Sequence, residues 1–189
     1  AQVRSGKLIN GEVMVREHAS LEAVSQSIEG NEKQFSLYPE YIVDELVVGD
    51  FISIDFNALL LQVIDTSPGI ASLRVLNGGK MGQNKAVTIG RHIAMPPLTD
   101  KDKQAIDIGL NMGIWNFALS FANYGSDIDE FRKLCREEAF IISKIECYNG
   151  FKNLTEIAQK SSAILIDRGD LSREFPIERI PSLQKRIIN

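Results

Sequence analysis

The sequence predicts a chain in two parts, an all-β part followed by an α/β part, with the boundary between residues 95 and 96. Before the boundary, short β-like runs alternate with turn residues, which is typical of a small β-barrel or sandwich. After it, helical and strand patterns alternate. The strands of this second part are nearly all apolar, as in a parallel sheet that helices cover. We therefore expect a small β domain over 1–95 and a segment of a (β/α) barrel over 96–189.

Turn residues separate the strands expected in the first part. Pro68-Gly69 and Asn77-Gly78 are dipeptides that commonly form turns between strands. Over 21–28 the apolar residues have a weakly helical spacing, so we expect a short helix or a loop there. The clearest predicted strands cover 13–15, 34–37, 51–54, 59–64 and 71–76.

The second part begins with a helix for which Thr99 is a suitable N-cap and which Gly113 closes. Trp115 lies at the start of the next strand and is expected to pack in the core. Asn149-Gly150 is expected to form a turn. The predicted strands cover 114–121, 140–146 and 164–166, and the predicted helices cover 100–112, 127–137, 151–160 and 180–189.

The second part supplies three β-then-α units, whereas a complete barrel of this type has eight strands. Three parallel strands leave two open edges and an uncovered inner face. We expect a fragment of a longer chain, a partner that supplies the remaining units, or a remnant that packs as a small α/β sandwich. The first residues and the end within a predicted helix favour a fragment.

The composition is that of an ordinary soluble globular protein, with 44% hydrophobic and 24% charged residues. The net charge of -4 argues against nucleic acid or an anionic membrane as a partner, because both need a basic face. No apolar run approaches the length of a membrane span. The two cysteines, Cys135 and Cys147, are too few for a disulfide scaffold, which indicates a reducing compartment inside the cell.

Charged side chains follow two neighbouring strands at the point where each strand ends. Lys144 and Glu146 are two residues apart in a strand, so both project from the same face. The next apolar strand, from Ala163 to Ile166, leads directly into Gly169-Asp170. One ammonium and two carboxylates can therefore converge beside a divalent metal and a developing enolate or phosphoryl charge. The alternative interpretation is a surface salt bridge.

These strand ends resemble the active-site strands of the pyruvate kinase family. The resemblance extends beyond them, covers nearly the whole chain in order, and implies strands four to six of the barrel together with a small β-barrel lid inserted ahead of them. The segments that carry it are Ser143-Lys-Ile-Glu146, Gly150, Arg168-Gly-Asp-Leu171, Pro97-Leu-Thr-Asp-Lys-Asp-Lys103, Val48-Gly-Asp-Phe-Ile-Ser-Ile-Asp55 and Asn77-Gly-Gly-Lys-Met-Gly-Gln-Asn-Lys85.

The resemblance implies a role for each site residue. Glu146 and Asp170 would be the protein ligands of Mg²⁺ or Mn²⁺, and Lys144 would stabilise the charge on the enolate oxygen and the transferring phosphoryl group. Backbone amides at Gly169 and Asp170 would hold the substrate carboxylate. Arg4 and Lys85 would bind the nucleotide phosphates. Arg168 would form a structural ion pair with a neighbouring carboxylate.

The resemblance also implies the surroundings of the reaction. The substrates would be phosphoenolpyruvate or pyruvate and ADP or ATP, and the parent protein would be a homo-oligomer in the cytoplasm or an organelle stroma. A K⁺ ion is also implied, with its ligands outside these 189 residues. This chain alone is therefore expected to be inactive.

Several positions depart from the family pattern. Phe56 stands where the lid usually has a second Asp, and Asp167 is a carboxylate where the family has Ala. The remaining departures are Asn123 for Arg, Cys147 for Asn and Ser172 for Gly.

These departures leave three functions open. The first is a pyruvate kinase. The second is a metal-dependent enzyme acting on pyruvate or oxaloacetate without a nucleotide, and the third is a non-catalytic, degenerate homologue. Retention of the Lys144, Glu146 and Asp170 trio argues against the third.

Overall fold

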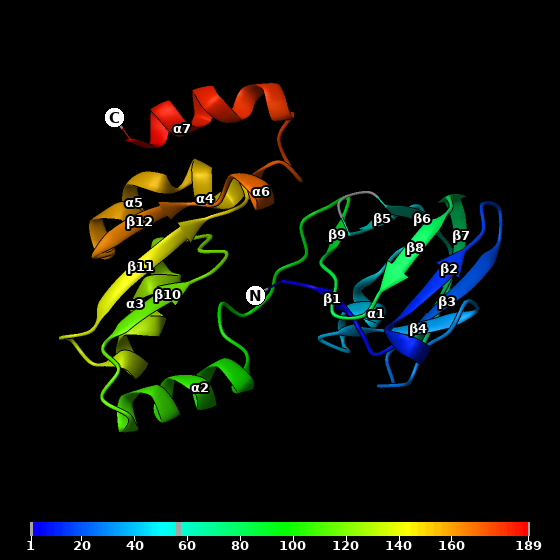
Figure 1. Cartoon of the computed structure of the whole chain (residues 1–189), viewed down its shortest axis with the longest axis horizontal. Coiled ribbons are helices and arrows are strands. Elements are labelled where there is room, and N and C mark those ends of the chain that lie inside the picture. Colours follow the sequence, from blue (N-terminus) through cyan, green and yellow to red (C-terminus); the bar gives the residue numbers. More distant parts are fainter. Residues whose placement is uncertain (1, 56–57, 189) are drawn as a thin grey trace. The chain divides into compact units, whose positions relative to one another are not determined.

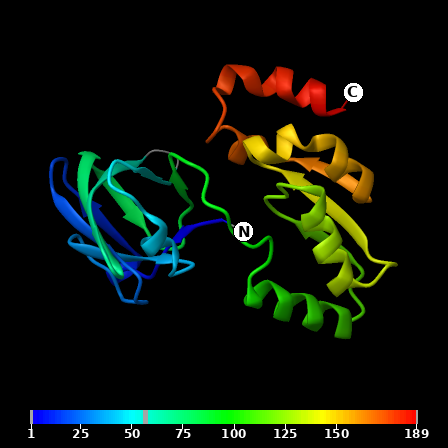
Figure 2. The same cartoon turned by 180° about the vertical axis from the view of Figure 1, so that it is seen from behind.

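A computed structural model of the chain describes residues 2–55 and 58–188, so Phe56 lies outside the described residues. The chain divides into two compact units, Gln2–Ala94 and Met95–Asn189. Figure 1 shows the two units in sequence colours, and Figure 2 shows them from behind. Each unit is described by itself.

The first unit is a nearly closed, mixed β-sheet of seven strands in the order β1-β4-β3-β7-β6-β5-β9. β3 and β4 are parallel, and the other neighbours are antiparallel. A separate pair, β2 with β8, is also antiparallel. The elements are β1 (Arg4–Ser5), η1 (Ile9–Gly11), β2 (Glu12–Val15), β3 (Ser20–Val24), β4 (Gln34–Tyr38), α1 (Ile42–Glu45), β5 (Phe51–Ile54), β6 (Leu59–Ser67), β7 (Ile70–Asn77), β8 (Gly79–Gly82) and β9 (Val87–Ile89).

The two ends of this sheet approach each other, so the sheet is nearly closed. Arg4 in β1 pairs with Ala86, the residue just before β9. The amide of Ser5 donates to the carbonyl of Lys85 at 2.9 Å, and the amide of Val87 donates to the carbonyl of Val3 at 2.9 Å. These contacts cover part of the two edges that an open sheet would present.

Alternate side chains along the strands are buried and fill the interior of this nearly closed sheet. Leu59, Leu61 and Val63 of β6 are buried, and their neighbours are more exposed. The same alternation in β3 buries Leu21 and Ala23. The helix or loop expected over 21–28 is therefore wrong for its first half, because hydrogen bonding to β4 and β7 on both sides overrides the weak helical spacing.

The second unit is built on a parallel sheet in the order β10-β11-β12. Helices pack on one face, and the core between them contains Ile128, Phe131, Ile141 and Ile157. The opposite face includes Leu165, which is 40% exposed. The elements are α2 (Asp100–Asn111), β10 (Asn116–Leu119), α3 (Gly125–Cys135), β11 (Phe140–Ile145), α4 (Tyr148–Lys152), α5 (Leu154–Lys160), β12 (Ala163–Ile166), α6 (Arg168–Leu171), η2 (Ile177–Arg179) and α7 (Ile180–Ile188).

Two local expectations in this unit are wrong. Trp115 lies before β10 and is 41% exposed, with the guanidinium of Arg136 5.7 Å from its ring centroid. Asn149 and Gly150 lie in α4 instead of a turn, since the Cys147 side chain caps that helix. A Cβ at Gly150 would lie 2.5 Å from the carbonyl oxygen of Ala122, so the glycine permits a close approach of the two backbones.

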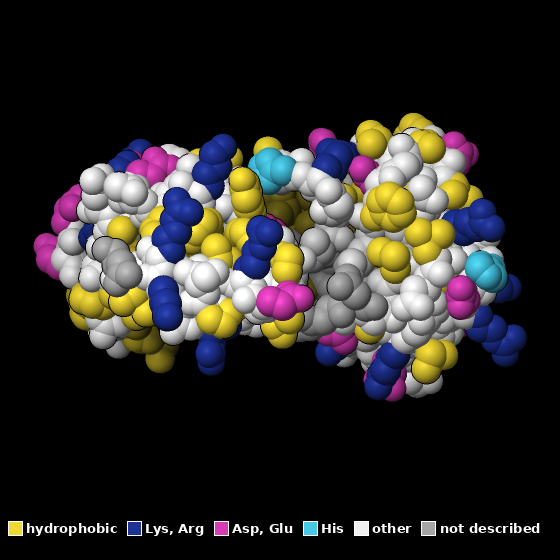
Figure 3. All heavy atoms as spheres, turned by 90° about the horizontal axis from the view of Figure 1, so that it is seen from above, with side chains coloured by type: hydrophobic (Ala, Val, Ile, Leu, Met, Phe, Trp, Pro, Cys, Tyr) yellow, Lys and Arg dark blue, Asp and Glu magenta, His cyan; other side chains and the backbone are white. Residues whose placement is uncertain are grey.

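Within residues 2–55 and 58–188, no helix is both long enough and apolar enough to span a membrane. Figure 3 shows one face of the molecule, on which Lys and Arg side chains lie among acidic and apolar ones. In this view the Lys and Arg side chains of each unit, taken by itself, do not gather into one basic area.

Gly79 in β8 tests the packing of the first unit. A Cβ there would lie 2.0 Å from the carbonyl oxygen of Ala58, so the backbone must move to admit one. We expect Gly79→Ala to lower the free energy of unfolding by about 2–3 kcal/mol, as overpacking does. Gly90→Ala is the control, because the nearest atom to its added Cβ is 3.6 Å away. Urea unfolding measures both, and equal stability of the two variants would contradict the packing described.

Cys135 tests the core of the second unit. Burial raises the pKa of this thiol to about 11, so at pH 8 roughly one molecule in a thousand carries the thiolate. We expect alkylation of Cys135 by iodoacetamide at pH 8 to be on the order of a hundredfold slower in the folded protein than in urea. Peptide-resolved mass spectrometry measures the rate at this site, and equal rates in both states would show that the thiol is not buried.

Candidate functional site

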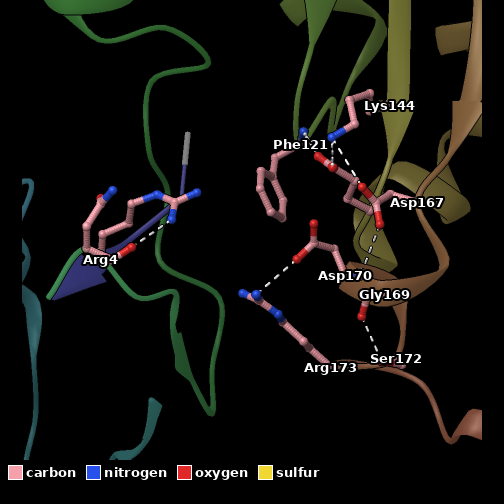
Figure 4. Close-up of polar contacts among 10 residues, drawn as sticks. Arg4, Phe121, Lys144, Asp167, Gly169, Asp170, Ser172 and Arg173 are labelled. Carbon is pink, nitrogen blue, oxygen red and sulfur yellow. Dashed lines mark hydrogen bonds and ion pairs between the residues drawn. The ribbon is translucent and has the colours of Figure 1, made fainter. Parts of the chain in front are cut away.

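The register of the parallel sheet brings the predicted charges together. Lys144 in β11 lies beside Leu165 in β12, and Ile145 lies beside Ile166. Both strands therefore end at the same edge of the sheet. Glu146 follows the end of one strand, and Asp167 follows the end of the other. Figure 4 shows the side chains that meet there.

Lys144 lies between two carboxylates. Its Nζ is 2.5 Å from Oε1 of Glu146 and 3.3 Å from Oδ2 of Asp167. The side chain of Glu146 is fully buried and that of Lys144 is 22% exposed. A carboxylate is buried in a protein only when it is paired, and Lys144 supplies the countercharge.

A backbone amide provides the second partner of Glu146. The N–H of Phe121 donates to Oε2 of Glu146 at 2.6 Å. Phe121 has a φ of 53°, a left-handed conformation that is uncommon for a bulky residue. The side-chain amide of Asn123 donates to the carbonyl of Phe121 at 2.9 Å, which supports this conformation. The sequence did not reveal this donor, because no side-chain type indicates which backbone amide will donate to a buried carboxylate.

The protonation equilibria of the three groups reflect this arrangement. Burial raises the pKa of Glu146, and the Lys144 ion pair and the Phe121 amide offset that effect only in part. Burial alone would lower the pKa of Lys144, but the contacts with Glu146 and Asp167 outweigh it and raise the pKa. Burial would likewise raise the pKa of Asp167, and the Asp170 amide together with Lys144 lowers it instead.

Asp170 has a cationic partner that the sequence analysis did not predict. Oδ1 of Asp170 lies 3.1 Å from Nη2 of Arg173, whose side chain is 13% exposed. Arg168 is exposed and forms no ion pair within the described part of the chain, so the structural ion pair expected for it is wrong. The sequence signal for Arg173 was its i,i+3 spacing from Asp170 on a helical turn.

The amide groups expected to bind a substrate carboxylate lie in α6. The amide of Asp170 points to Oδ1 of Asp167 at 3.4 Å, so the Asp167 side chain caps this short helix. The hydroxyl of Ser172 donates to the carbonyl of Gly169 at 2.6 Å. In this structure the Asp167 carboxylate therefore accepts from one of the two amides, that of Asp170.

The acidic side chains form a set of oxygen ligands that fits a hard divalent cation. Glu146, Asp167 and Asp170 each offer one carboxylate oxygen, and these oxygens all lie within 4.8 Å of one another. No described donor makes a well-aligned hydrogen bond to the buried Oε1 of Glu146. Clustered carboxylates of this kind suit Mg²⁺ or Mn²⁺.

Two of the departures from the family pattern contact each other. The thiol of Cys147 donates to Oδ1 of Asn123 at 3.2 Å and accepts from the amide of Gly150 at 3.4 Å. The side-chain amide of Asn153 donates to the carbonyl of Asn123 at 2.8 Å. Burial raises the pKa of Cys147 to about 11, so the thiol stays protonated and can donate. Asn123 and Cys147 therefore join the loop after β10 to the start of α4.

The nucleotide candidates lie in the first unit. Arg4 is half-buried, and its Nη1 donates to the carbonyl of Asn84 at 3.0 Å, as Figure 4 shows. Nζ of Lys85 lies 3.1 Å from Oδ2 of Asp55, and the Lys85 side chain is 47% exposed. Each cation thus has a partner within its own unit.

Parallel β-then-α units with a lysine and carboxylates at their strand ends, together with a nearly closed β-sheet unit, define an α/β protein with an acidic site. The family model for the barrel domain of pyruvate kinase matches residues 1–189. The chain belongs to the pyruvate kinase family.

Curated relatives support the same assignment. Pyruvate kinase 2 of Synechocystis sp. is 33% identical over 99% of this chain, the pyruvate kinase of Geobacillus stearothermophilus is 31% identical and that of Staphylococcus saprophyticus is 30% identical, each also over 99%. The chain spans 33% of the length of each of these relatives. The recognition made from the sequence is therefore confirmed for the family.

The contribution of the Phe121–Glu146 hydrogen bond to stability can be tested without any ligand. Glu146→Gln keeps an oxygen that can accept from the Phe121 amide, whereas Glu146→Ala leaves that amide buried without an acceptor. We expect the Ala variant to be less stable than the Gln variant by about 1–3 kcal/mol, the cost of an unsatisfied buried group. Urea unfolding of the two variants measures this difference, and indistinguishable midpoints would mean that the Phe121 contact contributes no stability.

Proposed function

We propose that the complete protein is a pyruvate kinase, which transfers a phosphoryl group from phosphoenolpyruvate to ADP and gives pyruvate and ATP. The observation that carries the proposal is the convergence of Lys144, Glu146 and Asp170 at one end of β11 and β12. Family membership supports the reaction class, and the retained trio supports the chemistry. The strands that would complete a barrel and its active site lie outside this chain.

In this proposal Glu146 and Asp170 hold Mg²⁺ or Mn²⁺, and Asp167 lies beside them. The cation would draw electron density from the substrate oxygens and neutralise charge in the transition state. Lys144 faces the same space as a fixed positive charge. It stabilises the negative charge that develops on the enolate oxygen as the phosphorus–oxygen bond to that oxygen breaks and a bond to the terminal ADP oxygen forms.

Amides at the start of α6 orient the substrate. In the proposal, the backbone N–H groups of Gly169 and Asp170 hold the carboxylate of phosphoenolpyruvate. For Asp170 this requires the substrate to replace the Asp167 oxygen that its amide now meets at 3.4 Å. That contact is long for a hydrogen bond, so its replacement costs little.

The two parts of the chain have separate roles in the proposal. Residues 1–95 form a small β-barrel lid, and residues 96–189 supply strands four to six of a (β/α)₈ barrel. The open edges of β10 and β12 support the second assignment, because a complete barrel leaves no strand unpaired. Arg4 and Lys85 of the lid hold the nucleotide phosphates. The whole protein is a homo-oligomer in the cytoplasm or an organelle stroma, and K⁺ binds outside this chain.

One observation favours a second candidate, a metal-dependent enzyme of pyruvate or oxaloacetate that uses no nucleotide. Lys85 is paired with Asp55, and Arg4 is bonded to the Asn84 carbonyl, so both cations proposed for the nucleotide are already engaged. ADP binding to the whole protein separates the two candidates. Binding that weakens in Lys85→Met supports the kinase, whereas no binding beside intact metal binding supports the second candidate.

The metal site is tested by a titration of Mn²⁺ into this chain, followed by oxalate, a mimic of the enolate. We expect Mn²⁺ to bind, oxalate to bind to the Mn²⁺ complex, and both Glu146→Gln and Asp170→Asn to weaken Mn²⁺ binding by at least about tenfold. Electron paramagnetic resonance of free Mn²⁺ measures the affinity.

The matched control is Asp129→Asn, which removes one carboxylate from α3 at a position paired with Lys160. This variant keeps the wild-type affinity if the effect is local. Failure of Mn²⁺ to bind to the folded wild-type chain would remove the proposed metal roles and favour the third possibility, a non-catalytic homologue.

A further inference from the structure

We propose that Asp167 acts as a third carboxylate of the cation site, where it raises the affinity for the divalent cation and lowers the affinity for the anionic substrate. The inference rests on the proposed function, since it concerns the same site. It assigns a specificity-determining role to a residue that stands where the family has Ala.

The first support is the position of the Asp167 side chain. It follows directly after β12, its Oδ2 lies 3.3 Å from Nζ of Lys144, and one of its oxygens belongs to the group that lies within 4.8 Å together with Glu146 and Asp170. The side chain is 32% exposed, so water screens its charge only in part. A carboxylate in this position interacts strongly with any ion held by its neighbours.

The second support is the balance of charge in the cluster. Glu146, Asp167 and Asp170 carry three negative charges, and Lys144 and Arg173 carry two positive charges. The cluster is therefore negative by one charge, whereas it would be neutral with Ala at 167. One more negative charge attracts a cation and repels the carboxylate and phosphate of a substrate, so the two affinities must change in opposite directions.

The third support is the contact of Lys144 with both carboxylates. Glu146 is buried and shares Lys144 with Asp167. Because of this second carboxylate, Lys144 keeps an anionic neighbour when a cation competes for the Glu146 oxygen. Without that second carboxylate, no anion would compensate the positive charge of Lys144, and the net repulsion of the cation would be stronger.

A purely structural role for Asp167 predicts a different result. Its Oδ1 accepts from the Asp170 amide and caps α6. Asn and Ser are comparable capping residues, so Asp167→Asn and Asp167→Ser keep a cap and remove the charge. A helix cap alone therefore predicts no change in either affinity for these two variants.

The experiment measures Mn²⁺ binding by electron paramagnetic resonance and then titrates oxalate into the Mn²⁺-loaded chain. We expect Asp167→Asn and Asp167→Ser to bind Mn²⁺ about tenfold more weakly and to bind oxalate several-fold more tightly than the wild type, the size that one neighbouring charge produces. Asp107→Asn, which removes an exposed carboxylate from α2, is the control and keeps both wild-type affinities. Urea unfolding of each variant reports whether the fold is retained.

Each other outcome overturns the inference. Unchanged affinities in folded Asp167 variants leave the proposed function intact and reduce Asp167 to a helix cap. Weakening of both Mn²⁺ and oxalate indicates a distorted site without the proposed charge effect. If the wild-type chain binds no Mn²⁺, the proposed function fails and the inference fails with it.

Discussion

The buried carboxylate of Glu146 is the constraint on which the rest of the site depends. A fully buried charge needs partners, and it receives an ammonium from the same strand and an amide from the loop after β10. The amide that it uses belongs to Phe121, whose backbone is left-handed with a φ of 53°. These two contacts join the loop after β10 to the end of β11, and the contact of Lys144 with Asp167 adds the residues after β12, so the geometry of the site and the packing of the sheet are set together.

Sequence patterns located this site because strand periodicity is a reliable guide to side-chain direction. Lys144 and Glu146 had to share a face, and apolar parallel strands had to end at a common edge. The family was also recognisable from short motifs. By contrast, the Phe121 amide could not be predicted, since its direction depends on backbone conformation. The Arg173 partner was missed although its i,i+3 spacing from Asp170 was a usable signal. The strand at Leu21 was missed because its pairing partners, which decide its conformation, are distant in sequence.

Two of the departures from the family pattern, Asn123 and Cys147, have hydrogen-bond partners in the second unit. Asn123 and Cys147 hydrogen bond to each other, and Asn123 also supports the carbonyl of Phe121. Residues that look anomalous one at a time therefore form a connected set behind Glu146. Compensation of this kind shows why a single atypical residue is weak grounds for judging a site defective, and why contacts must be considered before residue types.

Closure of the first unit has a consequence for the speed of folding. Residues 3–5 bond to residues 84–87, at separations of about 80 positions along the chain. During synthesis at about 5–20 residues per second, the first strand must wait on the order of 4–16 s for its partner to be made. Pairings of such high contact order form late and slowly. Strand partners in the second unit are only about 21–24 positions apart, so we expect its sheet to form faster than the closure of the first unit.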